Sequence, residues 1–184
     1  MKKALVVYAN GSEDMEVTAV TDILNRGKVK VIKAAVAKDG VEVTLAHGTK
    51  VICDENIASC NDVYDAIVIP GGLNGANNCR DCDVLIEKLK EQKSQKRIVA
   101  AICAAPGFVL AQKGIIDNER ATGYPGCDGN IKNCTHKGVE VSEDKIIITG
   151  KGPAFAIPFA LEILKALNGD DCMKAVASGM LLDI

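Results

Sequence analysis

A cysteine stands at the end of an apolar run in the segment "VAAICAAPGF", residues 99–108. The residues before Cys103 are typical of a buried strand, and Pro106 fits the first turn of a following helix, where its missing N–H costs little. Such a turn lifts a side chain clear of the sheet and aims it across the N-terminus of the helix. Backbone N–H groups and the helix dipole there favour a thiolate over a thiol. The pattern predicts a reactive Cys103; the alternative is a buried thiol that packs as a small hydrophobe.

Two other segments follow predicted strands and could serve this thiol. The loop "PGGLNG", residues 70–75, offers unencumbered backbone N–H groups for an oxyanion hole, or it is only a turn. It matches neither the dinucleotide-binding nor the P-loop pattern, which argues against phosphate binding. A helix begins near Glu13, Asp14 and Glu16, and the first two are typical of solvated first-turn residues that complement the helix dipole. The pattern alone leaves the role of Glu16 open.

The elements that must position these residues alternate along the chain. Ser12 is the expected N-cap of the first helix, and Gly27 its end. Strands that are apolar throughout and alternate with helices indicate a mostly parallel sheet covered on both faces, so we predict one α/β domain over residues 1–184. Sites in such sheets form at the carboxyl ends of the strands. The expected long strands are 3–9, 28–37, 64–72 and 97–103, with shorter strands at 40–46 and 50–55, a hairpin or final strand within 138–152, and later helices at 81–96, 105–114, 154–169 and 170–182.

Composition excludes several classes of function. The chain has 184 residues, a net charge of -2, no tryptophan and 3% aromatic residues, so neither electrostatic attraction nor base stacking points to nucleic acid. No apolar run approaches the length that a membrane-spanning helix needs, and the opening "MKKALVVYAN" is too short for a signal-peptide core. We therefore expect a soluble, cytoplasmic protein that binds neither nucleic acid nor membranes.

Eight cysteines are many for such a chain, but disulfides are not expected in reducing surroundings. "CRDC", residues 79–82, has the spacing of half a zinc site, yet the second half is missing, and Cys82 continues a helical stripe of apolar residues. Cys134 lies near His136, which makes a mixed site conceivable but poorly specified. We expect no metal and no cofactor, and we expect His47 and His136 to be surface residues rather than bases.

Four motifs in order, "YANGSEDMEV", "IVIPGGLNGANN", "IVAAICAAPGFVLA" and "TGYPG", resemble the ThiJ/PfpI superfamily, in the branch of the Parkinson's-disease-associated redox protein. The resemblance runs from residue 3 to about residue 168. It implies a flavodoxin-like sandwich with helices on both faces, a nucleophile elbow and a homodimer.

The resemblance also implies roles for individual residues. The reactive cysteine corresponds to Cys103, and an acidic partner, protonated and bonded to the sulfur or its sulfinate, corresponds to Glu16. Gly72 and Ala104 match the positions whose backbone N–H groups face the reacting oxygen. Arg26 falls near a family arginine that reaches the partner subunit's pocket.

The chain departs from the family at two positions. Protease-like branches carry histidine directly after the cysteine, where this chain has Ala104, and this disfavours a cysteine protease. Some relatives carry histidine where this chain has Tyr124, so a place in the pocket is expected for Tyr124.

The resemblance implies two main functions that share the same cysteine and glutamate. One is a sensor of oxidative stress in which peroxide converts Cys103 to a sulfinate stabilised by Glu16. The other is a cofactor-free glyoxalase or protein deglycase acting on methylglyoxal. The missing histidine favours the sensor, and a chaperone or interaction scaffold without catalysis is the remaining alternative.

Overall fold

The computed structural model describes residues 1–183, and a seven-stranded sheet forms its centre. The strand order is β5-β2-β1-β6-β7-β9-β8, and every neighbouring pair is parallel except β8 and β9. This is the flavodoxin-like arrangement that the sequence predicts. The strands of this sheet are β1 (Lys3–Ala9), β2 (Lys30–Val36), β5 (Glu55–Asn56), β6 (Ala66–Ile69), β7 (Ile98–Ile102), β8 (Val139–Val141) and β9 (Ile147–Gly150).

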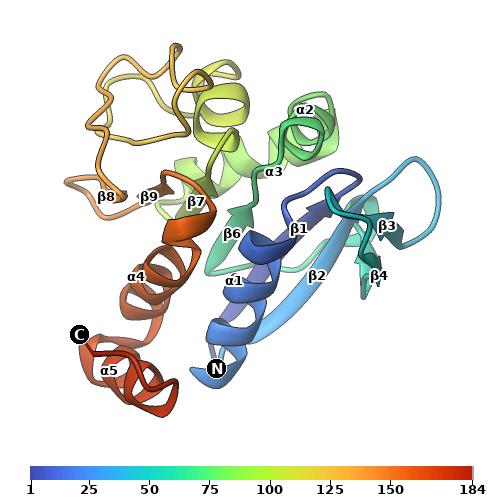
Figure 1. Ribbon diagram of the computed structural model, residues 1–184. Helices are drawn as coiled ribbons and strands as arrows, with labels where there is room; N and C mark the ends of the chain where they lie inside the picture. Colours follow the sequence, from blue (N-terminus) through green and yellow to red (C-terminus); the bar gives the residue numbers. More distant parts are fainter. Residues whose placement is uncertain (184) are drawn as a thin grey trace.

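Helices cover both faces of the sheet (Figure 1). One face packs against α1 (Asp14–Arg26), α4 (Ala156–Asn168) and α5 (Asp170–Gly179). The other face packs against α2 (Leu73–Arg80), α3 (Asp83–Ser94) and the π-helix η2 (Pro106–Ala111). Since both faces are covered, the central strands β6 and β7 are apolar along almost their whole length.

The remaining elements are short. β3 (Glu42–Thr44) and β4 (Lys50–Ile52) pair with each other as a separate antiparallel hairpin rather than at the edge of the main sheet. Two single turns of 3-10 helix, η1 (Ile57–Ser59) and η3 (Pro153–Phe155), complete the described chain. The predicted hairpin near the C-terminus is present as β8 and β9, and β9 also extends the parallel sheet beside β7.

Helix α1 differs from expectation at its first residue. Its N-cap is Glu13, whose carboxylate accepts a hydrogen bond from the backbone N–H of Glu16, whereas the Ser12 hydroxyl accepts from the N–H of Ala9. Gly27 ends the helix as predicted. The consequence is that Glu13 is a buried part of the helix start and not a solvated first-turn residue.

All eight cysteines are free thiols. Cys79 is fully buried in α2, and Cys82 precedes α3 and packs against the apolar residues of that face. Within residues 1–183, no helix combines the length and the hydropathy that a membrane span requires.

Candidate active site

The elbow forms where β7 ends and η2 is about to begin. Cys103 has φ 65°, in the left-handed region that residues other than glycine seldom adopt, which costs about 1–3 kcal/mol. Hydrogen bonds hold it on both sides: its N–H donates to the carbonyl of Gly150 at 2.9 Å, and its carbonyl accepts from the N–H of Tyr124 at 2.8 Å. The strain and the two bonds fix the direction in which the thiol leaves the sheet.

Glu16 meets the elbow from helix α1. Its side chain is fully buried, and Oε2 accepts a hydrogen bond of 2.7 Å from the backbone N–H of Gly71. Oε1 is also buried and has no hydrogen-bond partner. A carboxyl oxygen that accepts from an N–H favours the unprotonated form, so the proton of a neutral Glu16 belongs on Oε1.

Gly71 allows the thiol and the carboxyl group to lie so close. A Cβ at this position would come within 2.4 Å of the Cβ and 2.9 Å of the Sγ of Cys103, and within 2.9 Å of Oε2 of Glu16. Any larger residue would therefore force the two side chains apart. Gly72 is constrained as well, because it has φ 77° and a Cβ there would lie 2.2 Å from the carbonyl oxygen of Gly11.

Burial dominates the ionisation of both groups. It raises the pKa of Glu16 to about 7, and the charge of Glu13 adds to this, whereas hydrogen bonds with Gly71 and Cys103 oppose it. Burial, followed by the charge of Glu16, raises the pKa of Cys103 to about 12. Backbone hydrogen bonds from Gly72 and Ala104 lower the pKa of Cys103, but they do not outweigh burial. Burial therefore opposes the thiolate that the backbone N–H groups favour.

Two acids in such contact share one negative charge, because a second ionisation would place like charges together in a buried site. A thiolate at Cys103 therefore requires a neutral Glu16, and the proton that leaves the sulfur has a place on Oε1. The arrangement can supply a nucleophilic sulfur and, beside it, a carboxyl group that can take up the proton of the thiol.

The other predicted site residues are only partly brought together. Ala104 is buried directly after Cys103, whereas Tyr124 contributes its backbone N–H and keeps a side chain that is 47% exposed. The ring of Tyr124 lies against Gly152. Arg26 ends α1, about 15 Å along the helix from Glu16 at 1.5 Å per residue, and pairs with Asp22. Within one chain, Arg26 is therefore not part of the site.

Two residues of this site differ from the sequence-based expectation. The N–H of Gly71 in the glycine loop binds Glu16 rather than the sulfur. Glu13 is buried rather than solvated, and its spacing from Glu16 is the signal for this, because an N-cap side chain accepts from the N–H three residues later.

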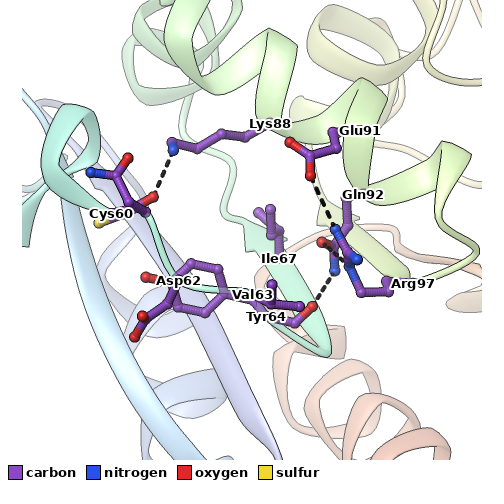
Figure 2. Close-up of a pocket in the computed structure, with 10 residues that line it drawn as sticks. Cys60, Asp62, Val63, Tyr64, Ile67, Lys88, Glu91, Gln92 and Arg97 are labelled. Atoms are coloured by element: carbon purple, nitrogen blue, oxygen red, sulfur yellow. Dashed lines mark hydrogen bonds and ion pairs between the residues drawn. The ribbon is translucent and has the colours of Figure 1, made fainter.

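A separate pocket of about 170 Å³ lies on the far side of the sheet from Cys103, at the amino-terminal ends of β6 and β7 (Figure 2). Its polar groups are largely satisfied within the protein: Lys88 donates to the carbonyl of Cys60, and the Gln92 amide donates to the carbonyl of Tyr64. Sites in sheets of this kind form at the carboxyl ends of the strands, where Cys103 lies and this pocket does not.

The chain is similar to known proteins over nearly its whole length. Protein dj-1beta of Drosophila melanogaster is 35% identical over 185 residues, which cover 98% of this chain and 97% of the relative. The glutathione-independent glyoxalase DJR-1.2 of Caenorhabditis elegans is 33% identical, with the same coverage of both chains. Protein DJ-1 homolog A of Arabidopsis thaliana is 35% identical, but this chain spans only 47% of its length.

Solved structures support the fold. Oxidized DJ-1 of Toxoplasma gondii superposes with a TM-score of 0.96 at 35% identity, and the match covers 100% of both chains. A putative protease I from Bacteroides thetaiotaomicron, at 18% identity and a TM-score of 0.79, shares the fold alone. The model of the DJ-1/PfpI family matches residues 2–166, and the chain belongs to this family.

Proposed function

We propose that the chain is a redox-sensitive cysteine protein of the oxidative and carbonyl stress response. The observation that carries the proposal is the contact of Cys103 and Glu16 across Gly71, where one side chain is a nucleophile and the other an acid with a pKa of about 7. Within residues 1–183, Glu16 is the carboxyl group whose pKa is raised, and Cys103 is the cysteine that meets it at Gly71.

The oxidation proceeds in two steps. The sulfur of Cys103 attacks one peroxide oxygen, the O–O bond breaks, and a sulfenic acid forms while the other oxygen leaves as hydroxide and is protonated to water. A second peroxide oxidises the sulfenate to a sulfinate in the same way. The sulfinate carries a lasting negative charge, which raises the pKa of Glu16 further and keeps its carboxyl group neutral and able to donate. The N–H groups of Gly72 and Ala104 are the other donors at the sulfur.

Peptide mass spectrometry after mild peroxide treatment tests this role. We expect two added oxygens on Cys103 before any of the other seven cysteines gains oxygen. Glu16→Gln keeps a donor and should preserve the sulfinate, whereas Glu16→Ala should lose it to further oxidation or to incomplete conversion. Oxidation spread evenly over all eight cysteines would show that the site is not tuned.

A glyoxalase or deglycase activity is the second candidate, and the similarity to the C. elegans glyoxalase favours it. Sγ of Cys103 adds to the aldehyde carbon of methylglyoxal and gives a hemithioacetal. Glu16 then moves a proton from that carbon to its neighbour, which converts the hemithioacetal to a thioester without an external oxidant. Hydrolysis releases lactate and the free thiol. Lactate formed from methylglyoxal without glutathione by the wild type, and not by Cys103→Ser, would support this activity.

The alternative without catalysis is a chaperone or interaction scaffold. It predicts that Cys103→Ala changes stability only. Neither the sensitivity to peroxide nor the turnover of aldehyde would then depend on a particular residue. The two experiments above therefore separate it from the sensor and from the enzyme.

We also propose a cytoplasmic homodimer. Eight free thiols suit a reducing compartment. An apolar hollow of about 390 Å³ lies between α1 and the start of α4, and its exposed side chains Met15 (60% exposed) and Ile157 (38% exposed) suit burial against a second copy. Sedimentation of the wild type and of Met15→Glu tests this interface, and a monomeric wild type would refute it.

A further inference from the structure

Three potential metal ligands meet in the irregular segment between η2 and β8, which Figure 1 shows as the yellow and orange loops. Asp128, Cys134 and His136 each point one ligand atom to the same place. Sγ of Cys134 lies 3.7 Å from Oδ2 of Asp128 and 3.5 Å from Nδ1 of His136. Nδ1 of His136 lies 3.4 Å from Oδ2 of Asp128. None of these residues belongs to the Cys103 site.

The three distances match one face of a tetrahedral zinc site. With bond lengths to zinc of about 2.3 Å for sulfur, 2.05 Å for nitrogen and 2.1 Å for oxygen, a tetrahedral angle places sulfur about 3.6 Å from either partner and nitrogen about 3.4 Å from oxygen. The observed separations of 3.7, 3.5 and 3.4 Å differ from these by about 0.1 Å at most. The His136 side chain is 69% exposed, so solvent reaches the cluster and water can supply the fourth ligand. We propose that Asp128, Cys134 and His136 form a zinc-binding site with one open coordination position.

The chemistry of the three ligands selects this metal. A thiolate and a carboxylate supply two negative charges. These balance the charge of Zn²⁺ when the imidazole binds in its neutral form. Mixed sulfur, nitrogen and oxygen ligands suit zinc, whereas Mg²⁺ and Ca²⁺ prefer oxygen alone. On binding, the S–H bond of Cys134 breaks, a sulfur–zinc bond forms, and one proton is released to solvent. No oxidant or reductant takes part.

Each ligand is held in place by a contact outside the cluster. The N–H of Gly126 donates to Oδ1 of Asp128, which leaves Oδ2 to the cluster. Backbone hydrogen bonds from Ala121 to Asn133 and from Thr135 to Ala121 flank Cys134 and fix its position. These contacts prepare the ligands without a metal and act as its supporting shell.

The backbone of His136 is held in the same manner. Its carbonyl accepts a hydrogen bond from Nζ of Lys151, and its φ of 56° lies in the left-handed region. Lys151 directly follows β9, so a contact with this end of the strand holds His136 in its strained conformation.

The segment also touches the elbow. A Cβ on Gly123 would lie 3.3 Å from Cβ of Asp128 and 3.4 Å from the carbonyl oxygen of Cys103. Bound zinc would therefore tie down the loop that packs behind the reactive cysteine. The metal site itself stands whether or not Cys103 has the function proposed above.

Co²⁺ is a suitable probe, because its bond to a thiolate gives a charge-transfer absorption band and its tetrahedral complexes give intense visible bands. The full chain would be reduced, stripped of metal with a chelator, and carry Cys103→Ser so that the elbow thiol does not compete. We expect one equivalent of Co²⁺ to produce both bands, Zn²⁺ to displace it, and one proton to be released per metal bound.

Matched variants assign the ligands. Cys134→Ser should remove the thiolate band, and His136→Asn should weaken binding by about 100-fold or more, since even supporting residues change metal affinity 10- to 100-fold. The matched controls Cys127→Ser and His47→Asn should leave the spectrum and affinity unchanged. Asp128→Asn keeps the size of the side chain and its bond with Gly126, so it tests the site even if Cys134→Ser unfolds. Absence of a thiolate band in the parent protein, or its persistence in Cys134→Ser, would overturn the proposal.

Discussion

Replacing Glu16 with glutamine removes an ionisable group from the interior but keeps the size of the side chain. The new amide oxygen can still accept from the N–H of Gly71, and its NH₂ group can still donate toward Cys103. The variant therefore isolates the contribution of the carboxyl proton to stability. It tests the claim that Glu16 is held in its neutral form by burial.

The sign of the effect follows from the direction of the shift. The pKa of Glu16 rises from its ordinary value of 4.5 to about 7 in the folded chain. As pH rises above 4.5, the unfolded chain loses this proton while the folded chain keeps it, so the free energy of unfolding falls until pH passes about 7. At about 1.4 kcal/mol per pKa unit, the whole change is about 3.5 kcal/mol, and about 3 kcal/mol of it falls between pH 4.5 and pH 8. Below pH 4.5 both states are protonated and the carboxyl group costs nothing.

Urea unfolding between pH 4 and pH 8 measures this cost. Far-UV circular dichroism is the appropriate signal because the chain has no tryptophan. The stability of Glu16→Gln relative to the wild type should increase by about 3 kcal/mol from pH 4.5 to pH 8. Protein concentration is held fixed, since association would change apparent stability.

Glu143→Gln, at an exposed position, is the matched control and should show no such trend. A difference between Glu16→Gln and the wild type that is constant across this range would refute the idea that burial keeps Glu16 neutral. A difference that shrinks as pH rises would refute its direction.

Three further substitutions test the structure around the site and in the core. Gly71→Ala places a Cβ 2.4 Å from that of Cys103, so it should destabilise the chain by about 1–3 kcal/mol and change the rate at which iodoacetamide alkylates the thiol. Arg120→Gln removes the guanidinium that donates to buried Glu140 at 2.9 Å and should cost about 2 kcal/mol in urea unfolding at pH 7; a neutral result would show that Lys137 suffices. Phe159→Ala empties a fully buried position and should cost about 3–5 kcal/mol by the same assay, whereas a cost below 1 kcal/mol would contradict its place in the core.

The sheet was predictable because its central strands leave little choice. β6 and β7 are covered on both faces, and only continuous apolar runs satisfy that environment. The elbow at Cys103 was predictable for a related reason: a strand that ends directly before Ala-Ala-Pro-Gly has few ways to continue.

Helix α2 was not predicted, and its composition explains this. Its sequence "LNGANNCR" contains three asparagines and a glycine, which have low intrinsic helix propensity. It is helical because Ala76 and Cys79 are buried against the sheet and η2, and because Gly75 packs on the backbone of Ser12. These are tertiary effects that the local sequence does not record. The N-cap of α1 fell to Glu13 instead of Ser12 for a similar reason, since the Ser12 hydroxyl already binds the end of β1.

The cluster of Asp128, Cys134 and His136 shows a further limit of sequence patterns. Cys134 and His136 are two residues apart, and Asp128 precedes them by six, which matches no common metal-binding spacing. The three meet because a single parallel bridge between Ala121 and Cys134 folds the loop back on itself. Neither hydrophobic periodicity nor cysteine spacing encodes such a bridge.

The electrostatics of the Cys103 site depend on the pair of acids more than on either one. A lone buried cysteine would simply have a raised pKa, as Cys79 has from burial, and would be inert. At the elbow the pKa of the Cys103 thiol is raised as well, but backbone N–H groups favour an anion on the sulfur. The carboxylate of Glu16 lies beside the thiol and can take up its proton as the sulfur attacks, so that the pair keeps a single negative charge. Once the sulfur is oxidised, the same carboxyl group becomes a neutral donor to the new anion. Burial would make an isolated thiol unreactive. In this pair, burial allows only one shared negative charge, so the chemistry depends on which of the two groups carries the remaining proton.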